Sequence, residues 1–140
     1  MGSGPNYVLD KGFLATGGSV AYNLGELVKQ ATTNFSGDSV AKATAGTDDV
    51  LGVCQENVDA TKVATGKVVV DIRLLGISRV IAGAAIAMGD RLVSDASSRA
   101  VPSARAAAGA QPARVFGRAL NAATAAGQHI DVLLTPGATY

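Results

Sequence analysis

Four residues of this chain are the candidates for chemistry: the aspartates Asp71 and Asp131, one histidine and one cysteine. Asp71 and Asp131 stand at corresponding positions of two similar segments, and two facing carboxylates can act as general acid and general base. His129 and Cys54 are each the only residue of their type, and neither has a metal-ligand partner at the usual spacing. We therefore expect no cofactor and no metal site, a buried Cys54 and a solvent-facing His129. A hydrolase that uses the two aspartates is the least favoured function.

The other carboxylates are explained by turns rather than by catalysis. An aspartate in a turn accepts hydrogen bonds from backbone N–H groups, and five aspartates lie in or beside predicted turns: Asp38, Asp48, Asp49, Asp90 and Asp95. The glycine-rich segment 83–89 lacks the Lys-Ser/Thr ending of a phosphate-binding loop. No catalytic residue is therefore predicted, and we expect the protein not to be an enzyme.

The elements that would position these residues are β-strands. Segment 67–75 is rich in branched residues and is followed by a break at Gly76, a second apolar strand over 78–81, and a turn at Gly89-Asp90 that starts a third strand. Other strand-like segments are residues 39–44, 50–54, 115–120 and 128–134, together with 21–31, which bends at Gly25.

The segments between the strands are assigned from their composition. Residues 55–65 are polar and read as a loop or irregular edge, and 121–127 as a short helical turn closed by glycine. Pro136 is expected to end the last strand. Segment 96–114, rich in Ala, Ser and Arg, is expected to be an exposed loop.

Pieces of the first half recur in the second half in the same order. The paired pieces are Gly37-Asp38-Ser39-Val40 with Gly89-Asp90-Arg91-Leu92, Val50-Leu51-Gly52 with Val115-Phe116-Gly117, and residues 65–72 with 126–132. Such an ordered recurrence predicts an internal pseudo-repeat. With no Trp and a core of Val, Ile, Leu and Ala, the chain is expected to be all-β, as a small barrel or a jelly-roll-like sandwich.

Charge and hydropathy exclude two classes of partner. Lys and Arg number 12 against 11 Asp and Glu, a formal net charge of +1, so there is no sequence-wide basic field for nucleic acid. The longest apolar run, residues 80–88, is far shorter than the roughly 20 residues that span a bilayer. We expect no nucleic-acid partner and no membrane partner.

The N-terminal residues 1–20 have two interpretations. Their short apolar pieces lie between glycine-rich flanks, which is typical of an arm that covers the end of a domain or adds a strand to a neighbouring protein. The alternative is an ordinary first strand folded onto the chain's own sheet. Under the arm interpretation a single β domain occupies residues 21–140, and Tyr7, Val8, Leu9 and Phe13 contact the partner.

Four arginines lie in or beside segment 96–114, namely Arg91, Arg99, Arg105 and Arg114. They could contact an acidic partner surface, and Arg99 and Arg105 are the candidate contacts, although solvated loop charges are the commoner alternative.

The order of the motifs resembles the small head-decoration, or capsid cement, proteins of tailed bacteriophages. The resemblance covers about residues 24–134 and rests on an ordered set rather than on any single motif. That set is GELVK at 25–29 and the segments 37–42, 50–53, 66–72, 85–92, 115–119 and 125–134. The long loop at 96–114 departs from the compact pattern of such proteins.

The resemblance implies a structural virion protein on the capsid exterior, made in the cytoplasm of a bacterial host. It would bind the outer surface of the major capsid protein shell and bridge neighbouring subunits to stabilise the head. A homo-oligomer, either dimer or trimer, would gain avidity from several modest contacts. A tail or receptor-binding β module is the alternative, for which aromatic residues are scarce, with three Phe, three Tyr and no Trp.

Overall fold

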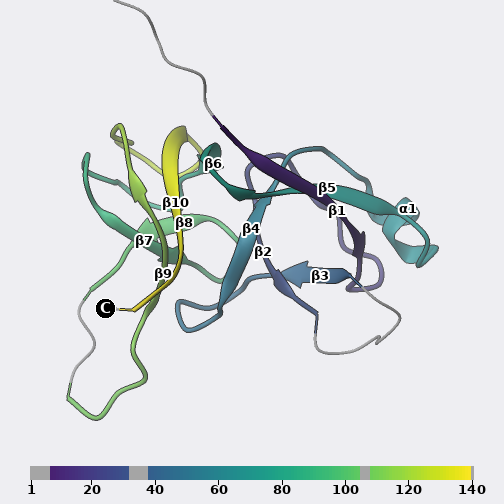
Figure 1. Ribbon diagram of the computed structural model, residues 1–140, viewed down its shortest axis with the longest axis horizontal. Helices are drawn as coiled ribbons and strands as arrows, with labels where there is room; N and C mark the ends of the chain where they lie inside the picture. Colours follow the sequence, from purple (N-terminus) through teal and green to yellow (C-terminus); the bar gives the residue numbers. More distant parts are fainter. Residues whose placement is uncertain (1–6, 32–37, 105–107, 140) are drawn as a thin grey trace, which may run out of the picture.

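The computed structural model describes residues 7–31, 38–104 and 108–139, and nearly all regular structure in these ranges is β (Figure 1). The predicted all-β class is confirmed. The strands are β1 (Leu9–Ala15), β2 (Leu27–Gln30), β3 (Ser39–Lys42), β4 (Val50–Cys54), β5 (Val69–Leu75), β6 (Ile77–Ile81), β7 (Arg91–Ser94), β8 (Ala100–Pro102), β9 (Arg114–Ala119) and β10 (His129–Thr139), and the helix is α1 (Ala60–Ala64).

The ten strands form two consecutive five-stranded units. The first, here called the barrel unit, is a closed barrel in the order β1-β3-β2-β4-β5, in which β1 runs antiparallel to β5 and parallel to β3. The second, the sheet unit, has the order β6-β10-β9-β7-β8. Figure 1 shows the sheet unit beside the barrel unit, with α1 at the far end of the barrel.

The two units have the same strand order. Read from β3, the closed barrel runs β3-β2-β4-β5-β1, and the sheet unit read from its other edge runs β8-β7-β9-β10-β6. Even the parallel pair that closes the barrel has a counterpart, because a parallel bridge joins Ala82, after β6, to Ala100 of β8. The chain is therefore a structural duplication, which confirms the predicted internal repeat.

The duplication extends to the hydrogen bonds of individual turns. Gly25 and Gly89 precede β2 and β7 and have positive φ angles of 89° and 88°, a conformation that glycine adopts without strain. The next residue in each turn, Glu26 or Asp90, accepts a hydrogen bond on its carboxylate from the N–H three positions earlier. The same side-chain chemistry therefore closes the same turn in both units.

One of the sequence correspondences is wrong. The sequence motif pairs segment 89–92 with 37–40, but its structural counterpart is 25–28, since β7 corresponds to β2 and not to β3. A Gly followed by an acidic residue occurs at both places, so the motif alone does not distinguish them. The match of 50–52 with 115–117 is confirmed, because Gly52 and Gly117 occupy the same register in the two units.

The units are joined through a shared core. The barrel interior has its own cluster of buried side chains, which includes Tyr22 and Ile72. A second cluster fills the sheet unit and also takes in outward-facing residues of β2 and β4: Leu27, Val50 and Val53. Removing these aliphatic groups from water stabilises the contact between the units by roughly 25 cal/mol per Å² of apolar surface.

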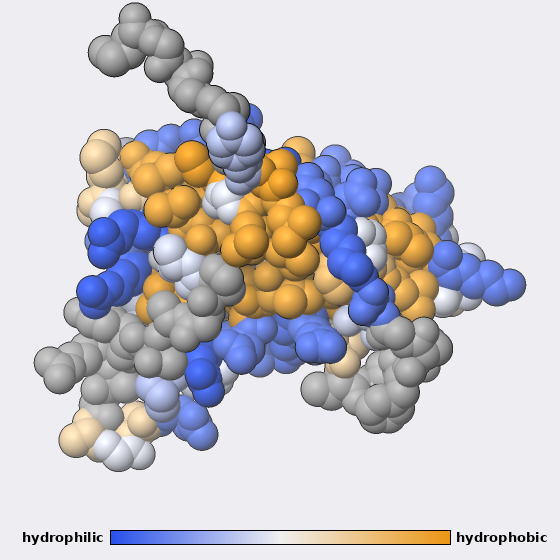
Figure 2. Space-filling view, viewed as in Figure 1, coloured by the Kyte–Doolittle hydropathy of each residue, from blue (hydrophilic) through white to orange (hydrophobic). Residues whose placement is uncertain are grey.

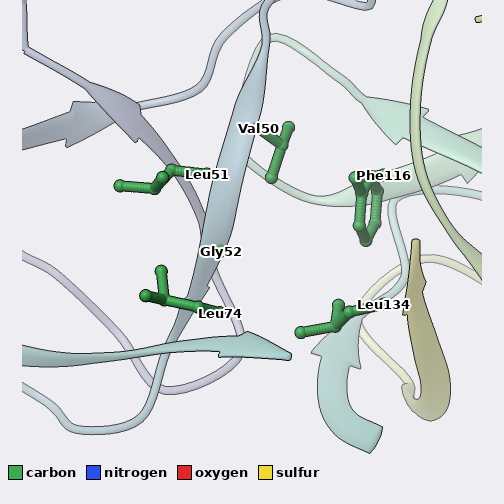
Figure 3. Close-up of a pocket in the computed structure, with 6 residues that line it drawn as sticks. All are labelled: Val50, Leu51, Gly52, Leu74, Phe116 and Leu134. Carbon is green, nitrogen blue, oxygen red and sulfur yellow. The ribbon is translucent and has the colours of Figure 1, made fainter. Parts of the chain in front are cut away.

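The boundary between the units leaves little empty space. Figure 3 shows Val50 of β4 facing Phe116 of β9 and Leu134 of β10, with Leu51 and Leu74 on the barrel side. The cavity between them is about 10 Å³, which is room for one water molecule at most. This junction is a packed core and not a ligand site.

Three predicted connections have a different structure. Within 55–65 the chain forms α1, because Asp59 caps it by accepting from the Lys62 N–H at 2.9 Å and Val63 is buried in the barrel core. Segment 121–127, predicted as a helical turn, contains no helix and instead forms a bridge between Ala123 and Ile86.

The predicted loop at 96–114 is also corrected. Its first part turns back at once, and β8 pairs with β7 as a hairpin, so Ala100 is buried rather than exposed. The last strand does not end at Pro136. A register shift between Leu134 and Ala138 lets β10 continue to Thr139, and proline is tolerated at such irregularities because no ladder N–H is needed there.

Candidate partner-binding surface

The N-terminal strand belongs to the barrel rather than to an arm. Residues 9–15 form β1, which pairs with β5 from Leu9 opposite Leu75 to Leu14 opposite Val69. The arm interpretation is therefore wrong for this part of 1–20, and the alternative of an ordinary first strand holds. Phe13 is corrected as a partner contact, because its side chain is buried in the barrel core.

The residues just before and at the start of β1 are exposed. Tyr7 is 84% exposed, and Val8 and Leu9 are also largely accessible to solvent. These three predicted contacts therefore lie where a partner can reach them. The structure adds Leu75, which is opposite Leu9 in the ladder and 46% exposed.

A second exposed leucine comes from the sheet unit. Leu133 of β10 is 41% exposed and lies opposite Ile77, which follows Leu75 after the single residue Gly76. Figure 2, viewed as Figure 1, shows apolar side chains gathered around the start of β1. We call Tyr7, Val8, Leu9, Leu75 and Leu133 the apolar surface.

The duplicated fold shows that Leu133 is a departure from the pattern of the barrel unit. Its counterpart there is Arg73, whose guanidinium donates to both carboxylate oxygens of Asp10, opposite it in the ladder, at 2.9 and 3.1 Å. In the sheet unit the same two places hold Leu133 and Ile77. An ion pair is thus replaced by two apolar side chains, of which Leu133 is exposed and Ile77 is half-buried. The exposed leucine favours a binding role over a folding role.

Leu75 and Leu133 were missed in the sequence, although a signal was present. Both stand in Leu-Leu pairs, 74–75 and 133–134, at strand positions. Because successive side chains of a strand point to opposite faces, one leucine of each pair must face outward. The sequence does not show which face the rest of the molecule covers.

The two predicted arginine contacts have different outcomes. Arg99 forms an ion pair with Asp95 at 3.1 Å, and Asp95 also accepts the N–H groups of Ser97 and Arg99. Arg99 therefore holds the turn between β7 and β8, and whether it also contacts a partner stays a prediction. Arg105 lies outside the described residues.

The residues considered for catalysis are not brought together. Asp71 lies in β5 opposite Gly12, and Asp131 lies in β10 opposite Arg79, each in its own unit. Their equivalence is structural, because each main-chain N–H donates to an acceptor side chain at 2.9 Å. The repeat therefore does not place the two carboxylates opposite each other.

Cys54 and His129 have the surroundings expected from the sequence. Cys54 is buried, its thiol donates to the carbonyl of Glu56, and burial raises the pKa of that thiol. His129 is exposed at the start of β10. In the ranges that the structure describes, no group of three or more metal-ligating side chains could hold an ion.

A shallow groove lies where the two units meet on the side of the turn between β7 and β8. Its volume is about 370 Å³, and its lining consists of Thr16, Gly17, Val20, Ala41, Lys42, Thr44, Ala96, Ser97 and Ser98. Lys42 is its only ionisable group, and the Glu26 carboxylate neutralises that ammonium at 2.8 Å. The lining thus offers no general acid or base.

No helix in the described ranges is long and apolar enough to cross a membrane. No family model matches the chain, and no curated protein does. Among solved structures the chain is similar to the N base of the head fiber gp8.5 of bacteriophage phi29, with a TM-score of 0.63 and 20% identity, over 92% of this chain and 95% of that chain. At this identity the likeness establishes the fold, so over nearly its whole length the protein has the all-β fold of that head fiber base.

Proposed function

We propose that the protein is a structural component of a bacteriophage head, which binds the outer surface of the major capsid protein shell and links neighbouring subunits. The observation that carries the proposal is the similarity of its fold to a phage head fiber base across 92% of the chain. The order of sequence motifs, which resembles capsid decoration proteins, supports the same class independently of the structure. The protein acts on the capsid exterior without catalysis.

The apolar surface is the shell-binding face in this proposal. Its five residues come from β1, β5 and β10 and the segment before β1, so both units contribute to it. Exposed apolar side chains grouped on one face are typical of protein interaction sites. A dimer or trimer of the chain would engage several shell subunits at once, and avidity would then compensate for the small area of each contact.

A receptor-binding module is less well supported. Of the described aromatic residues, Phe13, Tyr22 and Phe116 are buried, which leaves Tyr7 exposed. Carbohydrate recognition by stacking would depend on that one ring within the described ranges.

The test is co-sedimentation of the purified protein with empty phage heads. Wild type is expected to sediment at a fixed ratio to the shell protein. Leu133→Ser is expected to weaken binding about tenfold, since it removes an anchoring apolar side chain, which is worth about 1.4 kcal/mol or more at an interface. Removal of residues 1–8, which leaves β1 intact, should weaken binding as well.

Leu24→Ser is the matched control. Leu24 is 38% exposed, nearly the same as Leu133, but it lies in the turn before β2, outside the apolar surface. Its serine variant should bind heads as wild type does. Wild-type protein that stays in the supernatant would refute the proposal, and equal losses in both variants would refute the assignment of the surface.

A further inference from the structure

Two arginines lie beside the apolar surface on the outer face of the sheet unit. Arg91 of β7 is directly opposite Arg118 of β9, and Leu133 of β10 is opposite Arg118 on its other side. Both arginines are exposed. The face therefore presents two cations and one leucine in a row across three neighbouring strands.

The two arginines concentrate positive charge on this face. Directly opposite residues of an antiparallel pair have Cβ atoms about 4.5–5.5 Å apart, and like charges there repel. Within the described residues Arg118 takes part in no ion pair, so its exposed guanidinium is accessible to a carboxylate of a partner.

In the barrel unit the equivalent face is buried against the sheet unit. The counterparts of Arg91 and Arg118 are Leu27 and Val53, which are opposite each other in the same register. Both are fully buried, because the sheet unit packs on them. The face is therefore an interface in one unit, whereas in the other unit its two cations exclude an apolar partner and suit an acidic one.

We propose that Arg118 binds a carboxylate on the shell protein, next to the apolar contacts of Leu133, and that the positive charge of Arg91 opposite it favours the same acidic surface. The inference rests on the function proposed above and adds the charge of the partner surface. Arginine pairs with a carboxylate through two parallel hydrogen bonds, so these contacts fix the orientation of the protein on the shell as well as attracting it. The row contains no aromatic side chain for bases to stack on, and the net charge is only +1, which disfavours nucleic acid as the occupant.

The test compares three variants in co-sedimentation with empty heads. Arg118→Glu is expected to weaken binding about tenfold or more, because it sets a carboxylate against the carboxylates of the shell. Arg118→Lys keeps the charge but not the paired hydrogen bonds and should give an intermediate loss. Lys67→Glu makes the same change in net charge at an exposed site of the barrel unit and should bind normally.

Salt dependence and stability provide readouts that a structural role would not produce. Wild-type binding should weaken as salt rises, and Arg118→Glu should show less of this dependence. In the free protein at low salt, Arg118→Glu should melt above wild type, because Arg91 then faces an opposite charge.

The outcomes separate the two proposals. Wild type that does not bind heads overturns both. If wild type binds and Arg118→Glu binds as tightly, the acidic partner surface is refuted while the head function stands.

Discussion

At the scale of the residue, two glycines set the spacing of strands in the two units. A Cβ atom on Gly52 would lie 2.3 Å from the main-chain oxygen of Arg73, and one on Gly117 would lie 2.7 Å from that of Leu133. Both contacts are with backbone, which cannot move aside as a side-chain tip can. The close approach of β4 to β5 and of β9 to β10 therefore requires glycine at these two positions.

Gly52→Ala is expected to lower the free energy of unfolding by about 1–3 kcal/mol, the usual cost of overpacking a core. Urea unfolding of the variant and of wild type measures this difference in free energy. Gly46→Ala is the control, because its Cβ would be 3.5 Å from its nearest neighbour, an ordinary contact, and its backbone is not in the left-handed region. Equal stability of Gly52→Ala and wild type would show that the strands separate more easily than the structure implies.

At the scale of the element, the turn between β3 and β4 is held by one carboxylate. Asp48 accepts hydrogen bonds from the N–H groups of Thr44 and Ala45 at 2.8 and 3.1 Å and from the Lys29 ammonium at 2.9 Å. Burial acts to raise the pKa of Asp48, but these hydrogen bonds and the Lys29 charge outweigh it and lower the pKa. The charged form of Asp48 thus stabilises the folded turn.

The stabilisation should depend on pH in a defined direction. A carboxyl group whose pKa is lower in the folded state contributes fully above its unfolded pKa, about 3.9, and loses the contribution as pH falls through the folded pKa. Asp48→Asn should cost about 1 kcal/mol at pH 7 and less near pH 3. Urea unfolding of Asp48→Asn and wild type between about pH 3 and pH 7 tests this dependence. Asp49→Asn is the control, because Asp49 is the neighbouring residue and is exposed. A difference that does not change with pH would contradict the role of the charge.

At the scale of the whole molecule, the shared core makes the two units depend on each other. Phe116 of the sheet unit is 3% exposed and belongs to the cluster that also contains Leu27 and Val53 of the barrel unit. Cys54, the only cysteine, is buried in the separate cluster inside the barrel. A change in one unit should therefore be detected in the other.

Phe116→Ala is expected to cost about 3–5 kcal/mol in unfolding free energy. The reactivity of Cys54 towards a thiol reagent and the far-UV circular dichroism signal should then shift to lower urea concentration together. Val63→Ala, in the barrel core on α1, should shift both signals in the same way. Protection of Cys54 that outlasts the loss of secondary structure in Phe116→Ala would mean that the barrel unit folds independently.

The sequence by itself determined most of the strands and the class of fold. β4 was predicted over residues 50–54 and is observed there, and β5, β7 and β9 differ from their predicted ranges only at the ends. These segments were identified because branched residues and glycine-bounded turns act over a few neighbouring positions. Two of the three repeat correspondences were found for the same reason. That Tyr7, Val8 and Leu9 contact a partner stays a prediction.

Only the tertiary structure decided which strands pair and which faces are covered. The placement of β1 in the barrel, the pairing of β8 with β7 and the continuation of β10 past Pro136 all depend on partners distant in the sequence. The alternation of side chains gives each strand two faces but does not show which face is buried. Leu27 and Val53 are buried, whereas Arg91 and Arg118 are exposed at the equivalent positions. The reason is that packing between the units covers only the first pair. The candidate surface arises from that packing, so its residues from β5 and β10 could be named only after the two units were seen together.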